Sequence, residues 1–234
     1  GAKEEYDLDL VCKLQNGIRK TSYTQRSLKT LVGKEIQAYI VARGIKAPIE
    51  EKHRCWRIDY ADDLSFHIDI VPCIPEEETR KNIIFESVKS AGENEEVAKS
   101  VSDLTVSITD DRHPKYEVLC DDWLISNPEG YAEWFETRIH LYKQIIMEKA
   151  NVDDIPAYKR KTPLQRAVQL LKRHRDQMFK DDPDVKPISI IITTLAARAY
   201  KGELDLRTTL HNILAYMIDF INSGSSKVPN PVNP

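Results

Sequence analysis

The sequence predicts an α+β fold with two lobes. Strand patterns fill most of the first half of the 234-residue chain, whereas the second half reads as helices. This segregation of strands from helices is typical of α+β proteins. The chain is also long enough to bury the cores of two lobes. We place the boundary at a helix-starting sequence at residue 126, which gives a strand-rich lobe of residues 1–125 and a helical lobe of residues 126–234.

Composition is that of an ordinary soluble globular protein, with 41% apolar and 30% charged residues. A net charge of −3 predicts no general attraction to nucleic acid or to a membrane surface. No run approaches the ~18 apolar residues of a membrane helix, and no signal peptide is recognisable. The four cysteines form no Cys-x-x-Cys pair, so we expect neither a disulfide nor a zinc site, and we expect a reducing cytoplasm.

In the first half, apolar residues alternate in short runs or recur at helical spacing. Leu28, Val32, Ile36 and Ile40 recur every fourth residue, and Gly44 is placed to end that helix. An Asp62-Asp63 turn separates two runs that should form a hairpin. We therefore expect strands at residues 6–14, 55–60 and 64–71, a further hairpin of 104–108 with 116–119, helices at 21–43 and 75–91, and a mobile polar loop at 92–102.

In the second half, helix starts are marked by capping sequences. Ser126-Asn127-Pro128-Glu129 and Thr162-Pro163-Leu164-Gln165 both follow the capping-box pattern. Proline or aspartate opens the later segments, and Gly224 ends the last one. The expected helices cover residues 126–150, 162–179, 187–202 and 205–222, followed by a proline-rich tail without regular structure.

Asp7 and Asp9 lie one residue apart in an otherwise apolar run, residues 6–11. In a strand, residues i and i+2 face the same side, so both carboxylates should project into one site. Two such charges repel each other unless a cation neutralises them. Their oxygen ligands suit magnesium. The pair therefore predicts a metal site.

Asp69 is the candidate third ligand. It shares a strand face with His67, opposite the apolar side of residues 66–71. The alternative is an aspartate on a half-exposed strand with no role. Beside Asp7 and Asp9, however, three carboxylates on two strands can hold two ions about 3.5–4 Å apart, as in two-metal phosphoryl-transfer sites. Asp69 would also be placed to take a proton from an attacking hydroxyl.

A basic run covers residues 158–180, with eight cations and a single acid, Asp176. The buried stripe of its helix is predicted to consist of Leu164, Ala167, Val168, Leu171 and Met178. Lys172 lies at the edge of that stripe, where it can reach into a cleft and bind a triphosphate. The alternative is a surface lysine that packs its methylene stem on the protein.

Ser189 follows the helix-opening Lys186-Pro187-Ile188 segment. With Pro187 at the first helical position, Ser189 would be the third residue of the first turn. Backbone N–H groups and a hydroxyl there can bind an anion. The alternative is a serine that only satisfies its own helix end.

Five segments in this order resemble the DNA polymerase beta nucleotidyltransferase superfamily. The closer resemblance is to the bacterial cGAS/DncV-like nucleotidyltransferases, called CD-NTases, which are also similar to oligoadenylate synthetase. The segments are Glu5–Val11, His67–Pro72, Ser126–Phe135, Leu164–His174 and Pro187–Ile192. An Asp-x-Asp pair alone is a weak signal, whereas the ordered set is specific and extends over most of the chain.

The resemblance implies a bilobal fold with a mixed-sheet catalytic lobe, a helical lobe and an active site in the cleft between them. By position, Asp7, Asp9 and Asp69 resemble the catalytic metal ligands, and Lys172 and Ser189 resemble the contacts to the donor triphosphate. The implied cofactor is two Mg²⁺ ions, with Mn²⁺ as an alternative. The implied activity is synthesis of a cyclic di- or trinucleotide from ATP and/or GTP, with pyrophosphate release.

The same resemblance implies a bacterial, cytoplasmic monomer of CBASS-type antiphage defence. Its product would act on a downstream effector, and neither a nucleic acid template nor a membrane would take part.

One feature departs from the family pattern. Family members carry a Gly-Ser motif before the Asp-x-Asp strand, but only six residues precede Asp7 here, and Gly1-Ala2 is not that motif. We therefore expect a piece of a longer protein, which by itself is a poor catalyst or none. Two other functions stay open at this point: a template-independent transferase acting on RNA or protein, and an inactive relative that only binds nucleotide.

Overall fold

The computed structural model describes residues 6–14, 17–60, 66–149, 161–225 and 227–233, and it describes only the backbone of residues 6, 7 and 141–149. The chain divides into two compact units. The first consists of residues 1–84 and 102–128, and the second of residues 85–101 and 129–234. Within the described residues, no helix is both long and apolar enough to cross a membrane.

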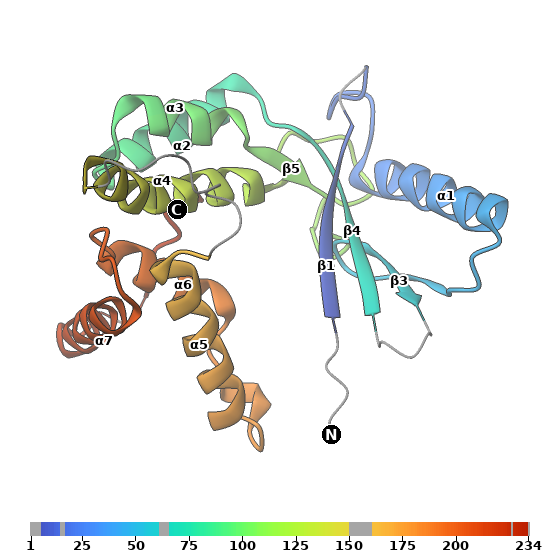
Figure 1. The fold of residues 1–234 in the computed structure, drawn as a ribbon. Helices are drawn as coiled ribbons and strands as arrows, with labels where there is room; N and C mark the ends of the chain where they lie inside the picture. Colours follow the sequence, from blue (N-terminus) through green and yellow to red (C-terminus); the bar gives the residue numbers. More distant parts are fainter. Residues whose placement is uncertain (1–5, 15–16, 61–65, 150–160, 226, 234) are drawn as a thin grey trace. The chain divides into compact units, whose positions relative to one another are not determined.

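A mixed sheet forms the first unit, as the sequence predicts. The strands are β1 (Tyr6–Lys13), β2 (Ile49–Glu51), β3 (Trp56–Tyr60), β4 (Phe66–Pro75), β5 (Val106–Ile108) and β6 (Leu124–Ser126). They run in the order β2-β3-β4-β5-β6, and β1 pairs with β4. The β1–β4 pair is parallel (Figure 1). The other pairs are antiparallel. The long strand β4 therefore joins the N-terminal strand to the rest of the sheet.

The expected hairpin of residues 104–108 with 116–119 is wrong. Strand β5 pairs instead with β4, which precedes it, and with β6, which follows residues 116–119. Residues 116–118 lie in turns, where the backbone N–H groups of Tyr116 and Val118 donate to His113 and Lys115. The side chains of Val118 and Leu119 are more than half exposed. This short apolar run therefore has no buried face to join to a sheet.

The mobile loop expected at residues 92–102 is also wrong, because helix α3 (Glu95–Asp103) occupies most of it. Asn94 starts the helix by accepting a hydrogen bond from the backbone N–H of Val97, at 2.8 Å. Ala98 and Val101 are fully buried, whereas Glu95 and Glu96 face solvent. Only two apolar residues of this helix are fully buried. The polar residues around them therefore obscure the helical spacing in the sequence.

Helix α1 (Gln25–Arg43) covers the sheet of the first unit. Thr24 caps its start by accepting from the backbone N–H of Ser27, and Gly44 ends it with a φ of 63°, which glycine adopts without strain. Leu28 packs with Ile74 and Trp123 in a buried cluster. The helix starts four residues later than expected. Helix α2 (Glu78–Ser90) also starts late, because β4 continues through Pro75.

The second unit is helical, as expected. Its main helices are α4 (Pro128–Lys149), α5 (Pro163–Met178), α6 (Ser189–Ala199) and α7 (Leu206–Asn222). Thr162 and Gln165 form the predicted capping box of α5. Met178, expected in the buried stripe, is 65% exposed because it lies in the last turn, beyond the packed part of α5. The core consists of Ile139, Leu164, Ala167, Val168, Ala196, Ala199, Tyr200 and Ile213.

Candidate functional site

The parallel pairing of β1 with β4 places the candidate carboxylates side by side. Asp9 is the direct strand partner of Asp69, and Asp7 is the partner of His67. Because side chains alternate between the two faces of a sheet, Asp9 and Asp69 leave the same face. Asp7 lies two residues earlier in β1, and its side chain is outside the described part of the structure. The backbone thus brings the three positions together, while the direction of the Asp7 carboxylate stays a prediction.

Asp69 forms a bidentate ion pair with Arg57, its partner on β3. Arg57 Nε donates to Oδ1 and Nη2 donates to Oδ2, both at 2.7 Å. These hydrogen bonds lower the pKa of Asp69, against the opposing effect of burial. The carboxylate therefore stays ionised at neutral pH, as a metal ligand must.

The sequence analysis missed Arg57. A two-residue turn at the expected Asp62-Asp63 would pair residue 57 with residue 68, whereas the observed register pairs Arg57 with Asp69. A register shift of one residue moves a side chain to the other face of the sheet, so the turn prediction by itself does not find this pair.

The carboxylates suit magnesium by their chemistry. Mg²⁺ prefers hard oxygen ligands in octahedral geometry, and Asp9 and Asp69 offer such oxygens from adjacent strands. Among the residues whose side chains are described, no group of three His, Cys, Asp or Glu residues is close enough to hold an ion. The expected triad requires Asp7, whose side chain is not among them. Asp7, Asp9 and Asp69 are therefore the residues that would hold the metal.

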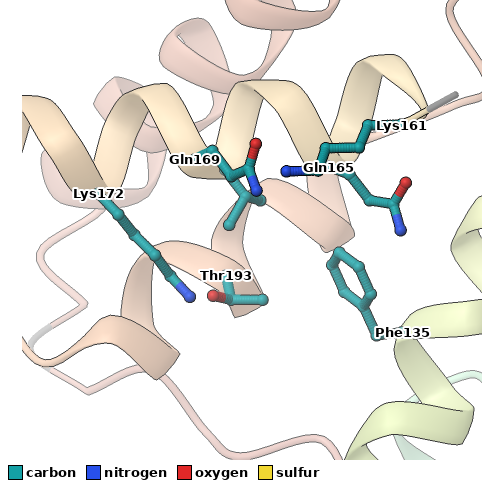
Figure 2. Close-up of a pocket in the computed structure, with 7 residues that line it drawn as sticks. Phe135, Lys161, Gln165, Gln169, Lys172 and Thr193 are labelled. Carbon is teal, nitrogen blue, oxygen red and sulfur yellow. The ribbon is translucent and has the colours of Figure 1, made fainter. Parts of the chain in front are cut away.

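Lys172 points into a cavity of about 210 Å³ within the helical unit. Figure 2 shows its side chain leaving α5 toward Thr193 on α6. Burial lowers the pKa of Lys172, and the nearby charge of Arg175 lowers it further. The ammonium group is thus half buried in a cavity, in contrast to a lysine that extends along the surface. The cavity is lined by Phe135, Lys161, Gln165, Val168, Gln169, Lys172 and Thr193.

Ser189 is the first residue of α6, where the sequence analysis expected the third. Helix α6 begins two residues after Pro187, because Ile188 has an extended backbone with a ψ of 148° and acts as the N-cap. Ile188 supplies no capping side chain, so the first N–H groups of α6 have no side-chain acceptor there. The exposed Ser189 hydroxyl accepts a hydrogen bond from Arg175 Nη1 at 2.9 Å. Its role as a phosphate contact stays a prediction.

Comparison with known proteins gives the same family as the sequence motifs. Residues 1–73 match the family described as "Cyclic GMP-AMP synthase DncV-like, nucleotidyltransferase domain". A protein from Roseivirga ehrenbergii named c-di-GMP synthase is 32% identical over 240 residues, which cover 99% of this chain and 54% of that protein. The chain is thus similar to the CD-NTases, and residues 1–73 match the nucleotidyltransferase domain of that family. It spans about half the length of this curated relative.

Solved structures confirm the CD-NTase fold, which is polymerase beta-like. The CD-NTase CdnG of Bradyrhizobium diazoefficiens, solved with GTP, superposes with a TM-score of 0.55 at 19% identity, over 94% of this chain and 58% of that one. The di-nucleotide cyclase DncV of Vibrio cholerae, solved with GTP and 5MTHFGLU2, gives a TM-score of 0.58 at 17% identity, over 99% and 52%. At these identities the likeness establishes the fold and nothing finer.

Proposed function

We propose that this chain is part of a CD-NTase, a metal-dependent nucleotidyltransferase that joins NTPs into a cyclic di- or trinucleotide. The observation that carries the proposal is the parallel β1–β4 register, which sets the Asp-x-Asp strand directly beside Asp69. Similarity to the CD-NTases supports the same reaction. The Roseivirga relative is named c-di-GMP synthase, so GTP is the first substrate to test and ATP the second.

In the proposed reaction, a ribose hydroxyl attacks the α-phosphate of a donor NTP. A new phosphorus–oxygen bond forms as the bond to the β-phosphate breaks, and pyrophosphate leaves. Asp7, Asp9 and Asp69 would hold Mg²⁺, or Mn²⁺ as an alternative, whose chemistry is charge neutralisation and Lewis acidity. Asp69 assists deprotonation of the attacking hydroxyl. A second round between the ends of the linear product closes the ring.

Lys172 and Ser189 would hold the donor triphosphate from the helical part. The cation carries charge that complements a phosphate, and the serine offers a hydroxyl beside backbone N–H groups at the start of α6. We retain residues 126–234 as the functional helical lobe and residues 1–125 as the metal-binding lobe.

We also propose that the whole protein acts as a cytoplasmic monomer in CBASS-type antiphage defence. Its cyclic product would bind a downstream effector, without a nucleic acid template or a membrane. The family resemblance supports these points.

The test is product analysis by mass spectrometry on the full-length protein with Mg²⁺, with GTP and ATP supplied singly and together. Asp7→Asn with Asp9→Asn, and separately Asp69→Asn, should remove cyclic product. Asp122→Asn is the matched control, because the side chain of Asp122 is 75% exposed and it should leave the product unchanged. Cyclic product from the double variant would refute the site assignment.

Two other results would redirect the assignment. Nucleotides added to an RNA or a protein, with no ring formed, would favour a template-independent transferase. Nucleotide binding without any product would favour an inactive relative.

A further inference from the structure

Arg175 joins the end of α5 to the segment that opens α6. Its guanidinium uses all three nitrogens, and the side chain is only 10% exposed. Nη1 donates to the Pro187 carbonyl at 3.0 Å and to Ser189 Oγ at 2.9 Å. Nε and Nη2 donate to Asp176 Oδ1 at 3.0 and 2.7 Å. A largely buried arginine side chain is thus held by an acidic neighbour and directed at the Ser189 hydroxyl.

The contact decides which way the Ser189 hydroxyl can act. A serine hydroxyl has one proton to donate and two lone pairs to accept with. Arg175 has no acceptor, so Ser189 Oγ must accept from it. The single hydroxyl proton is then left for another acceptor, and Ser189 lies on the exposed surface of α6. The arginine therefore holds Ser189 ready to donate to an incoming anion.

The charges around Ser189 fit the same ligand. Lys172 lies close enough to Arg175 for the positive charge of Arg175 to lower the pKa of the lysine. Lys186 Nζ lies 3.6 Å from Asp176, which also pairs with Arg175. Arg175 and Lys186 thus pair with one carboxylate, and Lys172 adds a third cation near them, while the segment that leads to α6 carries Asp181, Asp182 and Asp184. Asp176 meanwhile restrains the orientation of Arg175, because Nε and Nη2 both donate to its Oδ1.

We propose that Arg175 is a positioning residue of the donor-triphosphate site, which orients the Ser189 hydroxyl as a hydrogen-bond donor to a phosphate oxygen. The inference rests on the proposed function, because it assumes that Ser189 contacts the triphosphate. It adds a residue that acts through Ser189 and does not touch the nucleotide itself.

A double-mutant cycle on the full-length protein tests this inference. The probes are the non-hydrolysable α,β-methylene analogues of GTP and ATP, and the readout is the dissociation constant from calorimetry with Mg²⁺ present. The variants are Arg175→Gln, Ser189→Ala and the two combined. Arg166→Gln is the matched control, because Arg166 lies on the same helix with an exposed side chain. Thermal melting of each variant verifies that it is folded at the assay temperature.

Each single variant should weaken binding by about tenfold to a hundredfold, the loss expected for a hydrogen bond to a charged group. The double variant should bind about as weakly as Ser189→Ala alone, because Arg175 has nothing left to orient. Arg166→Gln should bind as the wild type does. A double variant whose loss equals the product of the two single losses would overturn the proposal, since Arg175 would then act independently of Ser189.

Arg175→Lys separates orientation from charge. Lysine keeps the positive charge but cannot bridge the serine, the Pro187 carbonyl and Asp176 together. Binding should therefore fall by several-fold, and full retention would overturn the positioning role. A variant that melts at a lower temperature yet binds as the wild type does would also overturn it, because the contact would then serve only the fold.

The outcomes keep this inference distinct from the proposed function. A wild type that binds the analogues but forms no cyclic product contradicts the proposed function and leaves the Arg175 cycle interpretable. A wild type that forms product while Arg175→Gln binds normally contradicts the inference alone. A wild type that binds neither analogue contradicts both.

Discussion

Replacing Glu76 with glutamine should strongly destabilise the first unit, because Glu76 is a fully buried carboxylate that four donors share. Lys20 Nζ and the backbone N–H of Glu77 lie 2.5 and 2.9 Å from Oε1. Ser107 Oγ and Arg80 Nη1 lie 2.5 and 3.0 Å from Oε2. The side chains of Glu76 and Lys20 are 0% and 1% exposed. Water therefore cannot solvate the Lys20 ammonium once the negative charge of Glu76 is removed.

The size of the effect follows from the burial of both partners. Glutamine leaves the Lys20 ammonium in the interior, where the Asp121 carbonyl at 3.1 Å is the other acceptor that the structure shows for it. Breaking a buried ion pair by removing one partner costs about 3–5 kcal/mol. For a protein of 150–250 residues, about 2–4 °C of melting temperature is lost per kcal/mol. Glu76→Gln should therefore lower the melting temperature by about 6–20 °C.

Differential scanning calorimetry and urea unfolding of the full-length protein measure this loss. Glu78→Gln is the matched control, because Glu78 is 72% exposed and pairs with Lys81 at 3.0 Å on the surface. That exposed pair should contribute less than about 1 kcal/mol. Lys20→Met combined with Glu76→Leu should recover part of the loss, since the fully buried ammonium is then removed together with the carboxylate. A cost below about 1 kcal/mol for Glu76→Gln would refute this account of the network.

Three further changes test other parts of the fold. Gly33→Ala should cost about 1–3 kcal/mol in urea unfolding, because the new Cβ would lie 2.3 Å from the Trp56 ring, and an unchanged midpoint would contradict that packing. Arg57→Gln should cost about 1–3 kcal/mol above about pH 5, and the difference from wild type should shrink below about pH 4. The sign follows from the lowered pKa of Asp69, whose stabilisation is present above its unfolded pKa and disappears as it protonates; a pH-independent difference in unfolding would contradict it. Thr162→Ala should remove the cap of α5 and cost about 1 kcal/mol, and calorimetry showing no change would contradict the capping role.

Local sequence patterns predicted the helices of the second unit best. Caps and periodicity are read from neighbouring residues, so the capping box of Thr162 and Gln165 was predicted at the residues that form it. The same rules failed where a short apolar face was surrounded by polar residues, as in α3. They also failed at Ser189, because Pro187 precedes α6 without joining it. A proline is compatible with both positions, and the surrounding contacts decide between them.

The sequence alone predicted which residues could carry the proposed chemistry. The i, i+2 spacing of Asp7 and Asp9, the strand position of Asp69 and the stripe edge at Lys172 all follow from periodicity within single elements. Such spacing depends only on local backbone geometry, which neighbouring residues encode.

Only the tertiary structure decided which groups meet. The pairing of Asp9 with Asp69 depends on the register between strands sixty residues apart. The bonds from Arg57 to Asp69 and from Arg175 to Ser189 likewise join separate elements. Register and packing are set by the burial of whole faces, so a partner across the fold cannot be read from the spacing within one segment.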